Sequence, residues 1–111
     1  MAQYNKQRIM NPNGVQLTYN AANAGGDTVY GPGPDCVLFV KNGGGSSINV
    51  TLVTPGTLNN GDTYPDKVIA VAAGTEKFIF CSAVDYADSN NLLNITWSAV
   101  TSVTFAAITT L

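Results

Sequence analysis

Residues 37–52 read VLFVKNGGGSSINVTL, and this stretch decides the class of the fold. Its last part, residues 48–52, alternates apolar and polar side chains with the period of two that a half-buried β-strand requires. Its first part belongs to a continuous apolar run over residues 36–40, which is typical of a strand that lies centrally in a sheet or sandwich. Because the glycines at 43–45 supply the positive φ values of a hairpin loop, we expect the two strands to pair as a hairpin.

The other strands are short and are separated by turn-forming residues. We expect a second hairpin from strands at 67–72 and 76–81, and further strands at 15–19, 93–97 and 103–108. The pattern predicts an all-β, single-domain antiparallel β-sandwich, immunoglobulin-like or a related barrel, with about seven short strands. This domain is expected to occupy residues 15–111, after an extended N-terminal arm at residues 1–14. The expected core consists of Ile48, Val50, Leu52, Phe78, Phe80, Ile95, Trp97, Val103 and Phe105.

The composition favours strands and excludes several classes of function. Val, Ile and Thr make up 29 of the 111 residues, and Glu76 is the only glutamate, which disfavours helices. Charged residues amount to 11% with a net charge of -2, and the basic residues do not cluster, so we expect no nucleic-acid partner. No stretch approaches the ~20 apolar residues of a membrane helix, and the polar start at residues 1–6 lacks the apolar segment of a secretory signal. We therefore expect a soluble chain with no targeting segment and no membrane partner.

The side chains that carry most enzyme chemistry are scarce. Histidine is absent, which removes the commonest general base and most zinc or copper sites. Two carboxylate pairs, Asp62 with Asp66 and Asp85 with Asp88, lie among turn-forming residues. For both, solvated turn residues are the favoured interpretation over general acid/base or calcium roles. We expect no enzyme, no catalytic residue, and no bound cofactor or metal.

Cys36 and Cys81 are the only two cysteines, and we expect them at the start of one strand and the end of another. A disulfide is possible if these strand ends meet. Free thiols that act as small hydrophobic core residues are the favoured interpretation. Neither cysteine has a histidine partner, so we expect no nucleophilic role.

Aromatic residues and the N-terminal arm are the candidate binding elements. The five tyrosines lie in the arm, at a strand end and in loops, where an amphipathic ring suits a protein interface. Within the arm we predict Tyr4, Arg8, Ile9 and Met10 as partner-binding residues, and we expect the arm to become ordered on binding. Trp97 is the largest candidate for a sugar-binding platform, but it shares a face with neighbouring apolar residues of its strand. We expect Trp97 to be buried.

The order of features resembles a family of virion proteins. After the polar arm come four motifs, at residues 37–45, 48–57, 71–79 and 95–108, which read VLFVKNGGG, INVTLVTPGT, VAAGTEKFI and ITWSAVTSVTFAAI. Together they resemble small virion proteins of tailed bacteriophages, especially of phages that infect actinobacteria. The resemblance implies a capsid decoration (cement) protein on the outer surface of the assembled head, often a homotrimer at local threefold positions, which stabilises the head. The implied partners are the major capsid protein and other copies of this chain.

Two other classes of protein stay open. A head-tail neck or tail component of the same virion would also be a small β-sandwich, and only its copy number and location would distinguish it. A carbohydrate-binding adhesin module would require Trp97 or several loop tyrosines to form an exposed platform.

Overall fold

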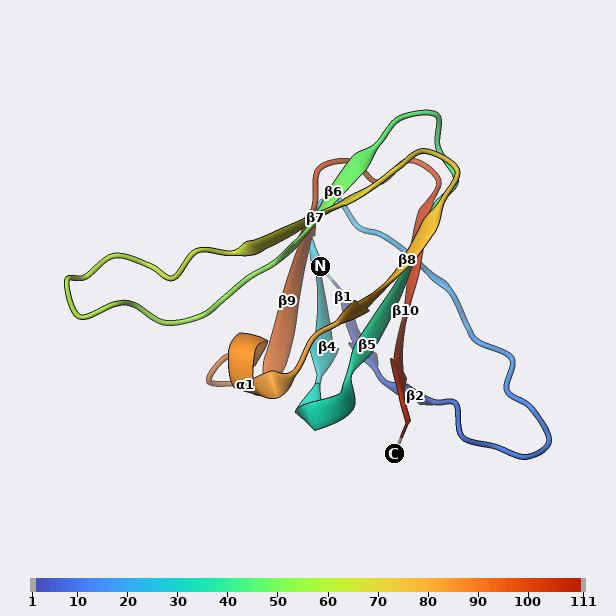
Figure 1. Cartoon of the computed structure of the whole chain (residues 1–111), viewed down its shortest axis with the longest axis horizontal. Coiled ribbons are helices and arrows are strands. Elements are labelled where there is room, and N and C mark those ends of the chain that lie inside the picture. Colours follow the sequence, from blue (N-terminus) through green and yellow to red (C-terminus); the bar gives the residue numbers. More distant parts are fainter. Residues whose placement is uncertain (1, 111) are drawn as a thin grey trace.

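The fold consists of two five-stranded sheets, and the computed structural model describes residues 2–110. Sheet A has the strand order β1-β4-β9-β6-β7, and sheet B has the order β2-β10-β5-β8, with β3 also pairing with β10 (Figure 1). Sheet A contains β1 (Ala2–Asn5), β4 (Asp27–Tyr30), β6 (Ile48–Leu52), β7 (Lys67–Val71) and β9 (Leu92–Trp97). Sheet B contains β2 (Gln7–Arg8), β3 (Asn20–Ala21), β5 (Val37–Asn42), β8 (Glu76–Phe80) and β10 (Val103–Thr109). The short helices are η1 (Gly33–Asp35) and α1 (Ala83–Tyr86).

Both predicted hairpins are wrong, because the chain crosses between the sheets at each of them. β5 pairs with β10 and β8, whereas β6 pairs with β7 and β9. The glycine-rich segment 43–47 is therefore an arch from sheet B to sheet A, and segment 72–75 is an arch back to sheet B. Alternation of side chains specifies which residues face the core, but it does not specify the neighbouring strand. The long-range pairings with β9 and β10 decide the neighbours here.

The hairpin between β6 and β7 has a long connection, residues 53–66. Figure 1 shows this segment extending away from both sheets. It is held together by its own bonds: a bridge pairs Thr57 with Thr63, and the Leu58 amide donates to the Asp62 carbonyl at 2.7 Å. At its base, the Thr54 amide donates to Asp66 Oδ1 at 2.8 Å.

The N-terminal segment is part of both sheets, so the free arm expected from the sequence is not seen. β1 pairs in parallel with β4, and β2 pairs in parallel with β10. Each sheet is therefore mixed, not purely antiparallel as predicted, and the immunoglobulin-like arrangement is not confirmed. The segment is ordered because it pairs with β4 in one sheet and with β10 in the other, and so covers one edge of each sheet. It also places Tyr4 edge-on against Phe105, with ring centroids 5.2 Å apart.

Residues 15–19 do not form the predicted strand. They belong to a loop that follows β2 and leads to β3, and Gln7 bonds to it twice. Gln7 Nε2 donates to the Thr18 carbonyl and the Thr18 amide donates to Gln7 Oε1, both at 2.8 Å. The Gln7 side-chain amide thus makes the two hydrogen bonds with the Thr18 backbone that a neighbouring strand would otherwise make.

The core lies between the two sheets and contains most of the predicted residues. Trp97 from sheet A contacts Phe105 from sheet B, with ring centroids 5.3 Å apart. Both are buried, as are the predicted core residues Ile48, Val50, Leu52, Ile95 and Val103. The prediction is wrong for Phe78 and Phe80, which lie on the outer face of sheet B. The alternate residues of β8 and its end, Ile79 and Cys81, occupy the core instead.

Candidate interaction surface

The outer face of sheet B is built from rows of cross-strand neighbours. On one face of a sheet, directly opposite residues are close enough for their side chains to touch. The pairing register places three rows across β10, β5 and β8: Ile108, Val37 and Phe80; Ala106, Phe39 and Phe78; Thr104, Lys41 and Glu76. Two complete rows are apolar, and the third is polar and carries a charge of each sign.

Stacked aromatic rings cover the middle of this surface. Phe39 and Phe78 stack with an interplanar angle of 16° and centroids 4.4 Å apart. Tyr19, from the loop before β3, extends the group, with its centroid 6.0 Å from that of Phe39. Lys41 closes one side, with Nζ 4.5 Å from the centre of the Tyr19 ring. We call Tyr19, Val37, Phe39, Phe78 and Phe80 the aromatic face.

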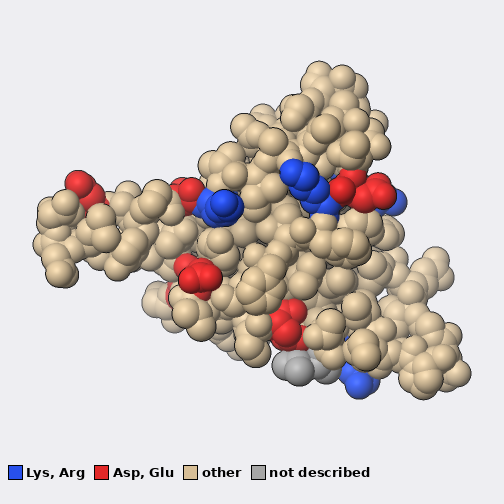
Figure 2. Space-filling view, in the orientation of Figure 1, with Lys and Arg blue, Asp and Glu red and all other residues tan. Residues whose placement is uncertain are grey.

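The aromatic face is open to solvent at β8. Phe78 is 67% exposed and Phe80 is 62% exposed. Contiguous exposed apolar side chains are a common feature of contact sites for other molecules. Charged side chains are few on the molecular surface seen in Figure 2. The chemistry available to the aromatic face is therefore apolar and aromatic packing, with one cation and one anion at its rim.

The free edge of β8 is less suited to binding than its face. β8 is the last strand of sheet B, so one side of its backbone has no strand partner within residues 2–110. Lys77 lies opposite Val40, which is a core residue, yet the Lys77 side chain is exposed. A charge on the inward-facing alternation of an edge strand opposes the addition of another strand. Contact through the rings is the arrangement this strand favours.

The predicted arm residues are distributed over different environments. Tyr4 is half-buried against the core, and Arg8 is exposed in β2. Ile9 donates its amide to the Thr109 carbonyl at 3.1 Å, and Met10 is 55% exposed. Ile9, Met10, Asn11 and Pro12 line a mostly apolar hollow. The structure does not bring the four predicted residues together as one patch, and their role in partner binding stays a prediction.

Trp97 is buried, as predicted, and its indole is part of an internal polar contact. Trp97 Nε1 donates to Asp27 Oδ2 at 2.9 Å, and Asp27 also accepts from the Asn23 backbone amide at 3.0 Å and from the Asn23 side chain at 2.5 Å. Asp27 is fully buried. Since this ring faces the core, it cannot serve as an exposed sugar platform.

The tyrosines divide into two groups. Tyr19, Tyr30 and Tyr64 are exposed, between 40% and 50% of each residue. Tyr4 and Tyr86 pack against the core, and burial is the largest cause that raises the pKa of Tyr86 above its usual value. Of the positions predicted in loops, only Tyr64 is an exposed loop residue, since Tyr30 ends β4 and Tyr86 ends α1; Tyr19, predicted at a strand end, lies exposed in a loop.

The carboxylate pairs bond to nearby backbone and amide groups. Asp88 accepts from Asn94 Nδ2 at 2.9 Å and from the amides of Asn90 and Leu92 at 2.8 and 3.0 Å. The Asn94 bond is the main cause that lowers the Asp88 pKa below its usual value. Asp66 accepts from a loop amide at the base of segment 53–66. Within residues 2–110 there is no group of three or more His, Cys, Asp or Glu side chains placed to hold a metal ion.

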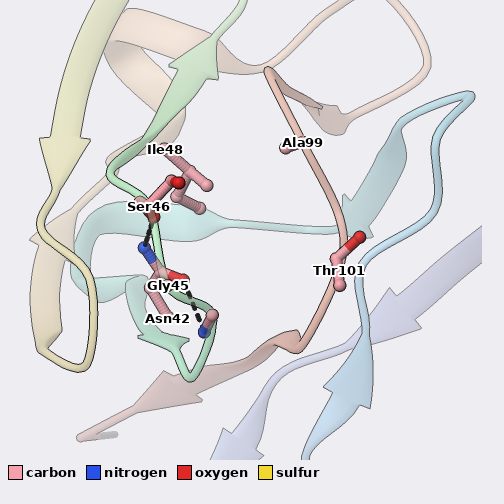
Figure 3. A pocket seen from close by; sticks show the side chains of 7 residues that line it. Asn42, Gly45, Ser46, Ile48, Ala99 and Thr101 are labelled. Carbon is pink, nitrogen blue, oxygen red and sulfur yellow. Dashed lines mark hydrogen bonds between the residues drawn. The ribbon is translucent and has the colours of Figure 1, made fainter.

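The glycine-rich arch lines a hollow of about 270 Å³ at one end of the sandwich (Figure 3). Asn42 is its one buried polar side chain. Its Nδ2 donates to the carbonyls of Ser46 and Val71 at 2.9 and 3.0 Å, and its Oδ1 accepts from the Gly44 amide at 3.0 Å. The amide is thus engaged within the fold, and we assign the hollow a structural role. A Cβ at Gly44 would lie 3.1 Å from the Thr101 carbonyl oxygen, which explains the glycine there.

Sequence reasoning missed the aromatic face because it assigned Phe78 and Phe80 to the core. One signal in the sequence could have located it. Lys41 shares an alternation with Val37 and Phe39, and a lysine is rarely buried without a partner. Phe39, on the same side of the strand as Lys41, is therefore expected to face outward. The residues opposite that side on β8 should then face outward as well.

No family model, curated protein or solved structure matches this chain. Among the described residues, no helix is long and apolar enough to cross a membrane.

Proposed function

We propose that this chain is a structural protein of a bacteriophage virion that decorates the outside of the assembled head and stabilises it. The observation that carries the proposal is the aromatic face, where Phe78 and Phe80 are both exposed on the same side of β8. An apolar patch of this kind is suited to burial against another protein. We take the major capsid protein as that partner because the sequence motifs resemble those of phage decoration proteins.

The mechanism would be adhesion by a preformed surface. The rings of Phe39 and Phe78 are already held by stacking, and β8 is held by its ladder to β5. Docking such a surface requires little ordering of side chains, which limits the entropic cost of binding. Each bound copy would stabilise the assembled head through its preference for that state.

The second partner in the proposal is another copy of the chain. In a homotrimer, linked binding sites can raise the overall affinity by roughly 10²–10⁴ without any new contact to the shell. Segment 53–66 offers a second surface for this contact, since Leu58 and Tyr64 are 41% and 42% exposed on an element that projects from the sheets. Sedimentation equilibrium of the purified chain tests this point. A trimer supports it, and a monomer at tens of micromolar would overturn the trimer.

Counting copies in purified particles tests the proposed location. We expect hundreds of copies per particle, measured against the major capsid protein on a quantitative gel. We also expect particles stripped of the protein to release their DNA at a lower temperature than complete particles. A ring of only a few copies, or identical release curves, would instead favour a neck or tail component.

Substitutions on the two sheets test the proposed surface. The double variant Phe78→Thr with Phe80→Thr should remain folded, because both side chains are largely exposed, and should fail to bind stripped particles in co-sedimentation. Val68→Thr is the matched control: Val68 is 54% exposed on β7, the edge strand of the other sheet. Full binding by the double variant, or equal loss in the control, would contradict a role for the aromatic face.

Binding through this face should depend only weakly on salt. Lys41 and Glu76 are the charged residues of its three rows, and screening acts mainly on exposed charges. We expect the amount of protein on the particles to change less than about twofold between low and physiological ionic strength. A steep loss with salt would identify a charged surface as the contact instead.

A further inference from the structure

Cys36 and Cys81 occupy directly opposite positions at one end of sheet B. The ladder between β5 and β8 ends with Val37 opposite Phe80, so the next residues in this register are the two cysteines. The Cys81 amide donates to the Cys36 carbonyl at 2.9 Å, which continues the ladder by one bond. Directly opposite residues of an antiparallel pair have Cα atoms about 4.5–5.5 Å apart, within the range that a disulfide spans.

The two sulfur atoms are already in contact inside the core. Their Sγ atoms are 3.2 Å apart, and Cys81 Sγ lies 3.4 Å from the Cys36 carbonyl oxygen. Both residues are fully buried, and both are free thiols in this structure. A disulfide has an S–S bond of about 2.05 Å, so closing it requires an approach of little more than an ångström, which side-chain rotation can provide.

We infer that Cys36 and Cys81 form a dithiol/disulfide pair that closes under oxidising conditions and fixes the edge strand β8 to β5. The residues are 45 positions apart in the chain, so the bond would close a long loop. Long closed loops restrict the unfolded chain most, and the disulfide should therefore stabilise the fold. This inference rests on the sulfur geometry and does not depend on the partner of the aromatic face.

The chemistry requires an external oxidant, for which we take a small-molecule disulfide such as oxidised glutathione. The Cys36 thiolate attacks one sulfur of the reagent, and a glutathione thiolate leaves. The Cys81 thiolate then attacks the Cys36 sulfur of this mixed disulfide, and the second glutathione thiolate leaves. Each cysteine loses one proton and one electron, and the reagent is reduced to two thiols.

The order of these steps follows from the contact between the sulfurs. The hydrogen bond from Cys81 is the main cause that lowers the pKa of the Cys36 thiol, and the same bond raises the pKa of the Cys81 thiol. In the folded chain, the Cys36 thiol therefore loses its proton more readily than the Cys81 thiol. Because both sulfurs are buried, we expect the exchange to be fastest while the chain is folding.

Peptide mapping of the full chain tests the inference. The purified protein is refolded in oxidised glutathione, blocked with an alkylating reagent under denaturing conditions, and digested with trypsin. We expect the peptides 9–41 and 78–111 to be linked in the monomer, and to separate when a reducing agent is added before blocking. Two alkylated cysteines after oxidation, or a link found only between two chains, would overturn the inference.

Thermal unfolding gives a second readout. We expect the oxidised protein to melt at least about 5 °C above the reduced protein. The double variant Cys36→Ala with Cys81→Ala should melt at one temperature under both conditions. If this variant does not fold, peptide mapping of the wild-type chain still decides. An equal melting temperature of oxidised and reduced wild type would contradict a stabilising bond.

Discussion

The two sheets share one core but present different outer faces. On sheet A, the outward residues of the central strands are mostly polar, such as Thr51 opposite Thr96. On sheet B, the outward positions of the two strands β5 and β8 carry stacked phenylalanines. Both faces consist of regular strands and need apolar residues only on their inner side. The fold therefore does not require the aromatic residues on the outer face of sheet B.

This difference shows where stability and binding are separated in the molecule. Sheet A places its one tryptophan in the core and bonds it to a buried carboxylate. Sheet B leaves Phe78 in solvent, stacked on a neighbour that is itself only half-buried. Deleting an aromatic ring should therefore destabilise the fold strongly when the ring comes from the inner side. The same deletion should impair only binding when it comes from the outer side of sheet B.

The largest expected effect comes from the one segment that belongs to both sheets. Deleting residues 2–8 removes β1 from sheet A, β2 from sheet B, and the contact between Tyr4 and Phe105. We expect the loss of stability to exceed the about 3–5 kcal/mol of a single large core truncation and to abolish cooperative unfolding. Circular dichroism during heating measures both the melting temperature and the cooperativity of unfolding.

A deletion elsewhere provides the control for the segment 2–8. Shortening the tip of segment 53–66 by residues 58–62 removes an element that bonds to itself, and the melting temperature should change by only a few degrees. If the chain without residues 2–8 melts like the wild type, the segment is the free arm that the sequence predicts, and both sheets lack these edges in solution.

Much of the fold could be predicted from alternation, but the outer face of sheet B could not. Residues 48–52 alternate between apolar and polar, so their inner side is unambiguous, and all three apolar residues are buried. In β8 the order Phe78, Ile79, Phe80 is apolar on both alternations, so periodicity gives no choice between the two sides. Packing against β5 makes that choice, because Ile79 lies opposite Leu38 in the core.

The contacts between strands were equally hidden from the sequence. A glycine-rich turn between two apolar runs is typical of a hairpin, and nothing local distinguishes it from an arch. The distinction depends on Gly43, whose amide donates to the Ser102 carbonyl at 2.9 Å, more than fifty residues along the chain. The contact between Cys36 and Cys81 was hidden for the same reason, since it requires knowing that β5 and β8 are neighbours.

The second-largest expected effect is the difference in the free energy of unfolding between removing a core ring and removing a ring of the aromatic face. Trp97→Ala should lower the free energy of unfolding by about 3–5 kcal/mol, because it leaves a cavity and removes a donor from buried Asp27. Phe78→Ala should lower it by about 1 kcal/mol or less, since it loses only a stacking contact at the surface. Urea unfolding of both variants measures the difference. Equal losses would mean that the outer rings also hold the fold together.

The smallest expected effect concerns the arch that carries the chain from the aromatic sheet to the polar one. Gly44→Ala places a Cβ 3.1 Å from the Thr101 carbonyl oxygen and 3.3 Å from Asn42 Oδ1, so the arch at 43–47 must shift away from segment 98–102. We expect a loss of about 1–2 kcal/mol in the free energy of unfolding. Gly45→Ala is the matched control, since a Cβ there meets nothing within 4 Å and its φ is not positive.

The control should be neutral or stabilising by up to about 1 kcal/mol, because alanine restricts the unfolded chain. Urea unfolding of the two glycine variants side by side therefore separates close packing from backbone freedom. If Gly44→Ala is as stable as Gly45→Ala, the arch does not pack against residues 98–102 in solution. The close approach of the arch at 43–47 to segment 98–102 would then not be what carries β5 and β6 into different sheets, and the pairings with β10 and β9 would have to do so without it.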